Sequence, residues 1–241
     1  MVKKLLCTAA LSAMAFGAQS AVLLSEGFEN VSALAGQGWV TSNTSSPVGT
    51  TGWFQGNSTV FPAQAGTDPS YIAANYLNTS ALGGNIINTL YTPVVYVANG
   101  ETISFWTKTD DDTDPGIAAI TTDRLRVLFS SSGSSTALTS FSQLLIINPA
   151  AAPGIYPTGW THYTATVSGL AAGASGRFAL QYNVPQFDGT QTATFPNYIG
   201  IDSVQISTVP VPAPLAMLGL GLVLALSLRA KRETRAAMPS A

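Results

Sequence analysis

The stretch Arg177-Phe-Ala-Leu-Gln-Tyr-Asn183 places its large apolar side chains, Phe178, Leu180 and Tyr182, at every second position. A period of two is typical of a β-strand that packs one face against a core. Comparable strand patterns occur on both sides of it, at residues 22–28, 71–74, 87–91, 101–107, 124–130, 141–147, 161–167 and 198–207. Together these segments predict an all-β domain.

Turn signals separate several of these segments, and no helical stripe longer than two turns interrupts them. Roughly nine or ten strands within about 190 residues suit a jelly-roll-like sandwich of two β-sheets. We therefore predict one such domain over residues 21–208. The turn signals are Asn99-Gly100, Ser132-Gly133, Pro153-Gly154 and Asp188-Gly189.

Charged residues are scarce and unevenly distributed. They make up 9% of the 241 residues, whereas about 25% is usual for a soluble protein. Residues 21–208 hold 11 acidic and 4 basic side chains, which gives this domain a net charge of −7. An acidic domain without a basic patch repels nucleic acid, so we exclude nucleic acid as a partner.

Residues 1–20 have the three parts of a secretory signal peptide. Lys3 and Lys4 form the positively charged start, and residues 5–16 form an apolar stretch. Ala18-Gln19-Ser20 places small residues at the two positions that signal peptidase reads, so we expect cleavage after this triplet. The sequence thus predicts export, with the Sec machinery and signal peptidase as partners.

Residues 209–241 form a tail of different composition. No charge occurs in residues 209–228, and the apolar part of this segment, residues 214–228, predicts one short transmembrane helix. A helix buried in a protein core would show a polar stripe, and this segment shows none. Basic residues follow directly, which predicts a cytoplasmic C-terminal end. These membrane-flanking residues are Arg229, Lys231 and Arg232.

The tail begins with Val209-Pro210-Val211-Pro212, so a proline motif, a membrane helix and a basic end follow one another. This arrangement resembles the PEP-CTERM sorting signals of exopolysaccharide-producing Gram-negative bacteria. The usual motif is Val-Pro-Glu-Pro, and Val211 stands in the place of the Glu. The resemblance implies an exosortase-type protease as a partner. The protein would be anchored in the inner membrane, and processing would release it to the cell surface or the extracellular space.

Three short motifs in the domain resemble the choice-of-anchor jelly rolls, a group close to cleaved-adhesin and MAM domains. Such domains are associated with adhesion and with contact to carbohydrate or matrix. The resemblance implies an adhesive or structural protein of an exopolysaccharide or biofilm matrix, and the alternative is a carbohydrate-binding module with a defined glycan site. The motifs are Ser25-Glu26-Gly27-Phe28-Glu29 followed by Gly38-Trp39, residues 88–93, and residues 198–206.

Residue types suited to enzymatic chemistry are few. His162 is the only histidine, it shares the polar face of its strand with Thr164 and Thr166, and no Gly-x-Ser-x-Gly motif occurs. A Ser-His-Asp triad and a histidine-ligated zinc site therefore lack support. A glycosidase would need a pair of carboxylates, and nothing in the sequence marks two acids as that pair. We predict no catalytic residues and no enzymatic activity, with a glycan-active hydrolase as the least favoured alternative.

One acidic residue occupies an apolar position. Asp202 shares strand parity with Val204, which predicts a carboxylate that points inward. A buried carboxylate needs hydrogen bonds, a charged partner or a metal ion. The jelly-roll resemblance implies a structural Ca²⁺ between the first and last strands, held by Asp202 with Glu26 or Glu29. The alternatives are an ion pair with Arg126 and a β-bulge that breaks the parity.

Aromatic side chains on loops can stack on the faces of sugars. Trp53 and Phe54 lie in a stretch rich in Gly, Asn and Ser, and they are the sequence's best candidates for ligand binding. Tryptophans buried beneath loops are the more common outcome. Trp106 lies in the middle of the predicted strand 101–107, and we expect it in the core.

Overall fold

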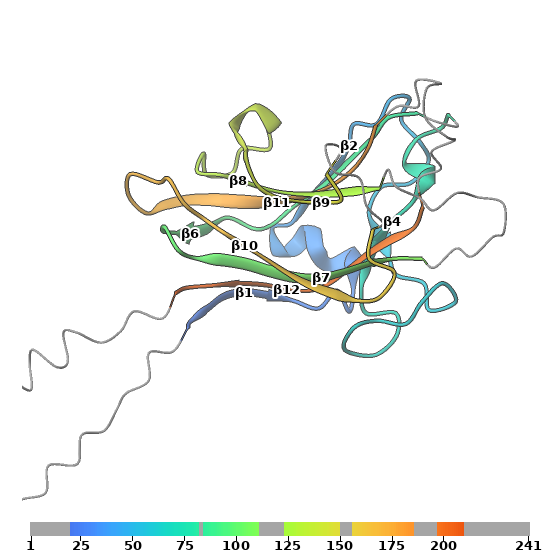
Figure 1. The fold of residues 1–241 in the computed structure, drawn as a ribbon, viewed down its shortest axis with the longest axis horizontal. Helices are drawn as coiled ribbons and strands as arrows, with labels where there is room; N and C mark the ends of the chain where they lie inside the picture. Colours follow the sequence, from blue (N-terminus) through green and yellow to red (C-terminus); the bar gives the residue numbers. More distant parts are fainter. Residues whose placement is uncertain (1–19, 82–83, 111–122, 150–155, 186–196, 210–241) are drawn as a thin grey trace, which may run out of the picture. The chain divides into compact units, whose positions relative to one another are not determined.

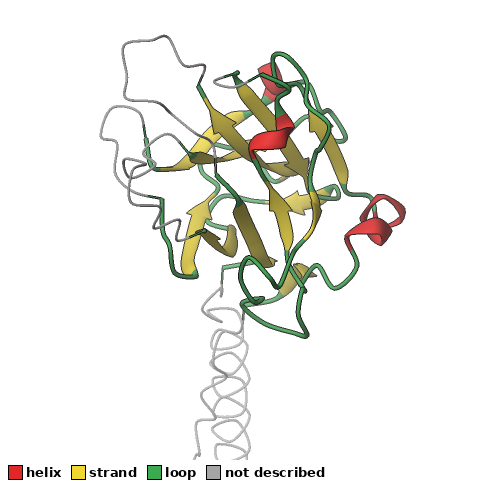
Figure 2. Ribbon diagram, turned by 90° about the vertical axis from the view of Figure 1, so that its right-hand side faces the viewer, coloured by secondary structure: helices red, strands yellow, loops and turns green. Residues whose placement is uncertain are grey.

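The computed structural model describes residues 20–81, 84–110, 123–149, 156–185 and 197–209. These residues form two antiparallel β-sheets packed face to face, which confirms the predicted all-β sandwich (Figure 1). In the part of the chain that the structure describes, helix is confined to short segments (Figure 2). These segments are the 3₁₀ helices η1 (Val31–Gln37), η2 (Tyr76–Asn78) and η3 (Leu138–Ser140).

Among the described residues, each sheet contains six strands. The first sheet has the order β10-β7-β12-β4-β3, and β1 also pairs with β12. The second has the order β2-β5-β11-β8-β9, and β6 also pairs with β11. The first sheet consists of β1 (Val22–Glu26), β3 (Phe54–Gln55), β4 (Ile72–Ala74), β7 (Thr102–Thr109), β10 (Thr161–Thr166) and β12 (Ile199–Ser207). The second consists of β2 (Val40–Asn43), β5 (Ile86–Tyr91), β6 (Val95–Val97), β8 (Arg124–Ser130), β9 (Ser142–Ile147) and β11 (Ala174–Val184).

The main core lies between the sheets and follows the period-two pattern of the central strands. Phe178, Leu180 and Tyr182 of β11 are fully buried in it, as predicted. Leu180 stands opposite Val127 of β8, which is also fully buried. Because both strands alternate in phase, their apolar faces meet the first sheet while their polar residues remain on the outer face.

The two ends that the sequence assigns to targeting lie almost wholly outside the described residues. Of the predicted signal peptide only Ser20 is described, and of the predicted tail only Val209. Residues Ala21–Val209 form one compact unit. Among the residues that the structure describes, no helix has the length and apolar character needed to cross a membrane. The predicted transmembrane helix 214–228 is not among those residues.

The strand β12 does not keep one parity along its length, and this corrects the predicted direction of Asp202. Ile201 belongs to the core between the sheets, and Val204 does too, although three positions separate them. A register shift against β7 lies between Asp202 and Gln205, and Ser203 there has a φ of 51°. Asp202 therefore stands opposite the outward-facing Trp106 and points to the outer face of the first sheet.

A second apolar cluster covers part of that outer face. Phe61, Tyr71 and Tyr198 are buried there, and Trp160 packs against them. The stacked rings of Phe61 and Tyr71 lie 5.0 Å apart, and Lys108 of β7 lies 4.3 Å from the centre of the Phe61 ring. This cluster holds the long connection between β3 and β4 against the sheet, and the same connection continues toward Asp202.

Candidate functional site

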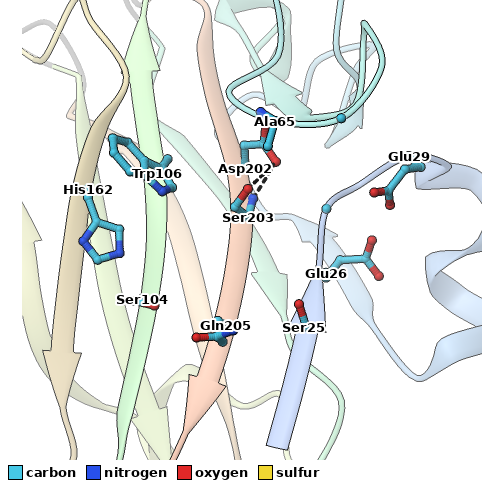
Figure 3. A pocket seen from close by; sticks show the side chains of 12 residues that line it. Ser25, Glu26, Glu29, Ala65, Ser104, Trp106, His162, Asp202, Ser203 and Gln205 are labelled. Carbon is cyan, nitrogen blue, oxygen red and sulfur yellow. Dashed lines mark hydrogen bonds between the residues drawn. The ribbon is translucent and has the colours of Figure 1, made fainter. Parts of the chain in front are cut away.

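An open pocket with a volume of about 370 Å³ lies on the outer face of the first sheet (Figure 3). Side chains of β7, β10 and β12 form one wall of it, and the end of β1, the chain that follows β1 and the loop before β4 form the rest. We name it the Trp106 pocket. The residues that matter for its chemistry are Ser104, Trp106, His162, Asp202, Ser203, Gln205, Glu26 and Glu29.

The pocket lies where β12 changes its neighbour. β4 pairs with residues 199–201 and β1 pairs with residues 204–207, so neither of these two strands pairs with Asp202 and Ser203. The edge of the sheet is thus interrupted beside these residues, and residues 27–29 border the interruption. Phe28 and Ser203 have positive φ values of 56° and 51°. Backbone conformations of this kind are uncommon outside glycine and often occur at functional sites.

Asp202 joins β12 to the loop before β4. Its side chain is 0% exposed, and its Oδ2 accepts hydrogen bonds from the backbone amides of Gln64 at 2.9 Å and Ala65 at 3.1 Å. Its Oδ1 accepts from the amide of Ser203 at 2.5 Å. Burial raises the pKa of Asp202, and these hydrogen bonds oppose the rise. Of the three partners that a buried carboxylate can have, which are hydrogen-bond donors, an opposite charge or a metal ion, Asp202 has hydrogen-bond donors.

Two further carboxylates face the pocket from the other side. Glu26 ends β1, is half-buried, and accepts a 2.7 Å hydrogen bond from the amide of Phe28. Burial raises the pKa of Glu26, and the charge of the nearby Glu29 raises it further. Glu29 itself is exposed at the rim. No lysine or arginine occurs among the described residues that line the pocket, so the charged side chains in this lining are acidic.

The structure brings Glu26, Glu29 and Asp202 to one pocket, as the calcium hypothesis expected. They do not form a compact ligand set, because among the described residues no three His, Cys, Asp or Glu side chains lie close enough to hold a metal ion. Asp202 is already satisfied by amides, which leaves Glu26 and Glu29 as the acidic pair facing open space. A calcium ion here stays a prediction.

An aromatic wall stands opposite these acids. Trp106 of β7 and His162 of β10 are register partners, and their ring centres lie 5.1 Å apart. Trp106 is half-buried and His162 is exposed, so part of this surface is open to a ligand. Ser104 and Gln205 are also register partners and stand side by side below the rings. No hydrogen bond joins His162 to a carboxylate in the described part of the chain, so its visible neighbour is an indole ring.

The predicted sugar-stacking residues lie elsewhere. Trp53 is 8% exposed and belongs to the core between the sheets, with its Nε1 enclosed and unpaired. Phe54 packs against the outer aromatic cluster, and its ring centre lies 5.7 Å from that of Tyr198. The structure therefore corrects the choice of Trp53, because its side chain is buried in the core, and Phe54 is half-covered.

The expectation that Trp106 lies in the core is also wrong. Ile103 and Phe105 of β7 point inward, while Ser104, Trp106 and Lys108 alternate with them on the outer face. The sequence contained this signal, since Trp106 shares its parity with a serine and a lysine. Tryptophan is a large apolar residue, and the prediction of a core position rested on that property instead of on the alternation of the strand.

No protein-family model matches this sequence, and no curated protein matches it either. Among solved structures, it is similar to the K1 cleaved adhesin domain of Lys-gingipain from Porphyromonas gingivalis W83, with 22% identity and a TM-score of 0.48. That similarity covers 78% of this chain and 97% of the gingipain domain. The K3 cleaved adhesin domain of the same protein gives 22% identity and a TM-score of 0.46 over 77% of this chain and 98% of that one.

Carbohydrate-binding modules are also among the structural neighbours. The CBM22-2 xylan-binding domain of Paenibacillus barcinonensis Xyn10C has 13% identity and a TM-score of 0.42, and covers 77% of this chain and 99% of its own. The neighbours thus include adhesin domains and carbohydrate-binding β-sandwiches. At these identities and TM-scores, the similarity identifies neither a family nor a ligand for this chain.

Proposed function

We propose that this chain is an exported, non-catalytic module that binds carbohydrate through the Trp106 pocket and thereby acts in adhesion. The half-open indole of Trp106, set beside an open polar pocket, is the observation that supports this most directly. Sugar-binding sites combine an aromatic face, which packs on the C–H groups of the sugar ring, with a few fixed polar groups that bond its hydroxyls.

The polar groups of the pocket suit hydroxyl recognition. Gln205 offers an amide donor and an acceptor, and Ser104 beside it offers a hydroxyl. The carboxylates of Glu26 and Glu29 accept hydrogen bonds from sugar hydroxyls across the pocket. Because Glu26, Ser104 and Gln205 lie on β1, β7 and β12 of one sheet, the fold holds these three side chains in place before a ligand arrives.

The charge of the pocket narrows the ligand class for this site. Three carboxylates line it without an arginine or lysine to balance them. A uronate or sulfated sugar would meet like charge here, and juxtaposed like charges cost affinity. We therefore propose that the Trp106 pocket takes a neutral glycan, such as a polysaccharide of unmodified hexoses or pentoses.

The proposed setting is the extracellular matrix of a bacterium. The signal peptide at residues 1–20 and the PEP-CTERM-like tail at residues 209–241 support export, membrane anchoring and processing by an exosortase-type protease. A glycan-binding sandwich delivered in this way would hold exopolysaccharide to the cell surface or crosslink it after release. Mass spectrometry of the mature C-terminus tests the processing step independently of glycan binding.

Glycan-array screening of the purified protein, followed by calorimetry on the best neutral oligosaccharide, tests the binding site. We expect Trp106→Ala to weaken binding by about tenfold or more, since an aromatic contact is worth roughly 0.5–1.5 kcal/mol beyond the apolar area that it buries. Tyr76→Ala is the matched control, because Tyr76 is an aromatic side chain that is 55% exposed and lies outside the pocket. Wild-type affinity in the Trp106 variant, or no glycan binding by the unmodified protein, contradicts the proposal.

A further inference from the structure

A buried arginine on the outer face of the second sheet lacks a counter-charge. Arg177 of β11 is only 5% exposed, and its Nε is enclosed without a hydrogen-bond partner. Within the part of the chain that the structure describes, no hydrogen bond or ion pair reaches its guanidinium. An arginine side chain stays charged in proteins, and a charge that is largely buried is stabilised by an opposite charge. The arrangement therefore calls for an anion.

A loop rich in hydroxyl groups lies beside this guanidinium. Ser130 of β8 stands directly opposite Arg177, and residues 131–141 continue from it to β9. The Ser130 hydroxyl donates to Ser140 at 3.0 Å, and the Ser140 hydroxyl donates to Ser135 at 3.2 Å. Eight of the eleven residues 130–140 are serine or threonine. The part of the chain that begins at the register partner of Arg177 thus offers neutral donors and acceptors and contains no acid.

Tyr91 of β5 connects Arg177 to the same loop. The Tyr91 hydroxyl donates a 3.0 Å hydrogen bond to the carbonyl of Thr136 in the loop. Burial raises the pKa of Tyr91, and the positive charge of Arg177 opposes that rise, so the two side chains are close. Arg177, Tyr91 and the 130–140 loop therefore form one local site.

We propose that Arg177 and the 130–140 loop bind an oxyanion, a carboxylate or sulfate group carried by an acidic polysaccharide. The guanidinium supplies paired N–H donors that match the geometry of a carboxylate or sulfate. The serine and threonine hydroxyls supply donors and acceptors for the sugar that carries it. This site is on the sheet opposite the Trp106 pocket, and it takes the ligand class that the acidic pocket disfavours.

Arg126 shows what a satisfied arginine looks like on the same face. Its Nε donates to Gln143 at 2.9 Å, and its Nη1 donates to Gln181 at 3.0 Å. It lies on β8, which pairs with the strand of Arg177. Arg126 thus has the same residue type, charge and sheet face as Arg177 but already has its partners. Arg126→Gln is therefore the matched control for Arg177→Gln.

Calorimetry on the full chain tests the proposal with four probes: a uronate oligosaccharide, a sulfated oligosaccharide, a neutral oligosaccharide of equal length, and sodium sulfate. We expect the two acidic oligosaccharides to bind, and Arg177→Gln to weaken them by about tenfold. Arg126→Gln should change their affinity by less than about threefold, and Trp106→Ala should leave it unchanged. The last comparison separates this site from the proposed neutral-glycan site, because each can fail while the other holds.

Three results overturn the proposal. The first is equal affinity of Arg177→Gln and wild type for the acidic oligosaccharides. The second is binding of sodium sulfate with no gain from the attached sugar, which means an adventitious ion only. The third is binding of neither acidic oligosaccharide. Because Arg177→Gln could unfold the domain, Arg177→Lys is measured beside it. Lysine keeps the positive charge but lacks the paired N–H donors of the guanidinium. We therefore expect its affinity to lie between those of wild type and the glutamine variant.

Discussion

The Tyr182 hydroxyl donates a 2.9 Å hydrogen bond to the carboxylate of Asp123, and both side chains are fully buried. The backbone amide of Asn197 donates to the same carboxylate at 3.1 Å. Burial raises the pKa of Asp123 to about 7, although these hydrogen bonds and the charge of Arg124 lower it. A buried acid that titrates near neutral pH links the stability of the sandwich to pH.

We expect the contribution of Asp123 to stability to fall as pH rises. Its ordinary pKa is 3.8, so between about pH 4 and pH 7 the folded state keeps a proton that the unfolded state releases. The folded state is therefore favoured by this group at low pH and loses that advantage as pH rises through 7. Urea unfolding at pH 4.5, 5.5, 6.5 and 7.5 should show a loss on the order of 2–4 kcal/mol from this group.

Asp123→Asn isolates that contribution. The variant carries no titratable group at this position, so its stability should decline less steeply between pH 4.5 and 7.5 than that of wild type. Glu26 and Asp202, whose pKa values are also raised by burial, act in the same direction but remain in both proteins. The difference between the two pH profiles therefore belongs to Asp123, and parallel profiles would refute its role.

Removal of the Asp202 carboxylate should release the loop before β4. In Asp202→Ala the part-buried amides of Gln64 and Ala65 lose their acceptor, and the buried side of the loop loses its link to β12; an unsatisfied donor that stays out of water costs about 1–3 kcal/mol. We expect a loss of about 1–3 kcal/mol in the free energy of unfolding, since water can reach the amide of the exposed Ala65, and faster hydrogen exchange at these two amides. Asp202→Asn keeps one side-chain oxygen as an acceptor and should lose less. Unchanged exchange at both amides would contradict this role.

The sequence predicted those parts of the fold that depend on neighbouring residues. Phe178, Leu180 and Tyr182 pack inward because the alternation of β11 is continuous and local. The direction of Asp202 could not be predicted in this way, since its amide partners Gln64 and Ala65 lie 138 and 137 positions away. A bulge that depends on such distant partners leaves no local pattern in the sequence.

The candidate site was predicted in part. The opening motif and the last strand placed Glu26, Glu29 and Asp202 near each other, and they line one pocket. Its aromatic wall was missed, although Trp106 shares its face with Ser104 and His162 shares its own with two threonines. The pairing of β7 with β10 creates that wall, and strand order in a sandwich is a long-range property that alternation alone does not determine.

Calcium should act through the Glu26–Glu29 pair. Two like charges face one pocket whose lining has no lysine or arginine, so a divalent cation would neutralise both. We expect millimolar Ca²⁺ to raise the thermal midpoint by several degrees over a chelator control, since binding at 100 times the Kd adds about 2.7 kcal/mol. Glu26→Gln combined with Glu29→Gln should abolish the shift. An unchanged thermal midpoint in wild type would contradict calcium binding in this pocket, and the amide hydrogen bonds would then be the stabilising partners of Asp202.

Gly200 on β12 should not tolerate even a methyl group. A Cβ there would lie 2.9 Å from Phe61, 3.0 Å from Trp160 and 3.0 Å from Tyr71, all rings of the outer aromatic cluster. Overpacking of this kind typically costs about 1–3 kcal/mol, so Gly200→Ala should lower the free energy of unfolding by that amount. Gly159→Ala is the matched control, because nothing lies within 4 Å of its Cβ position and we expect no comparable loss. Chemical denaturation of both variants measures the difference. Equal stability would mean that the rings move aside at no cost and that the cluster does not fix the loop on the sheet.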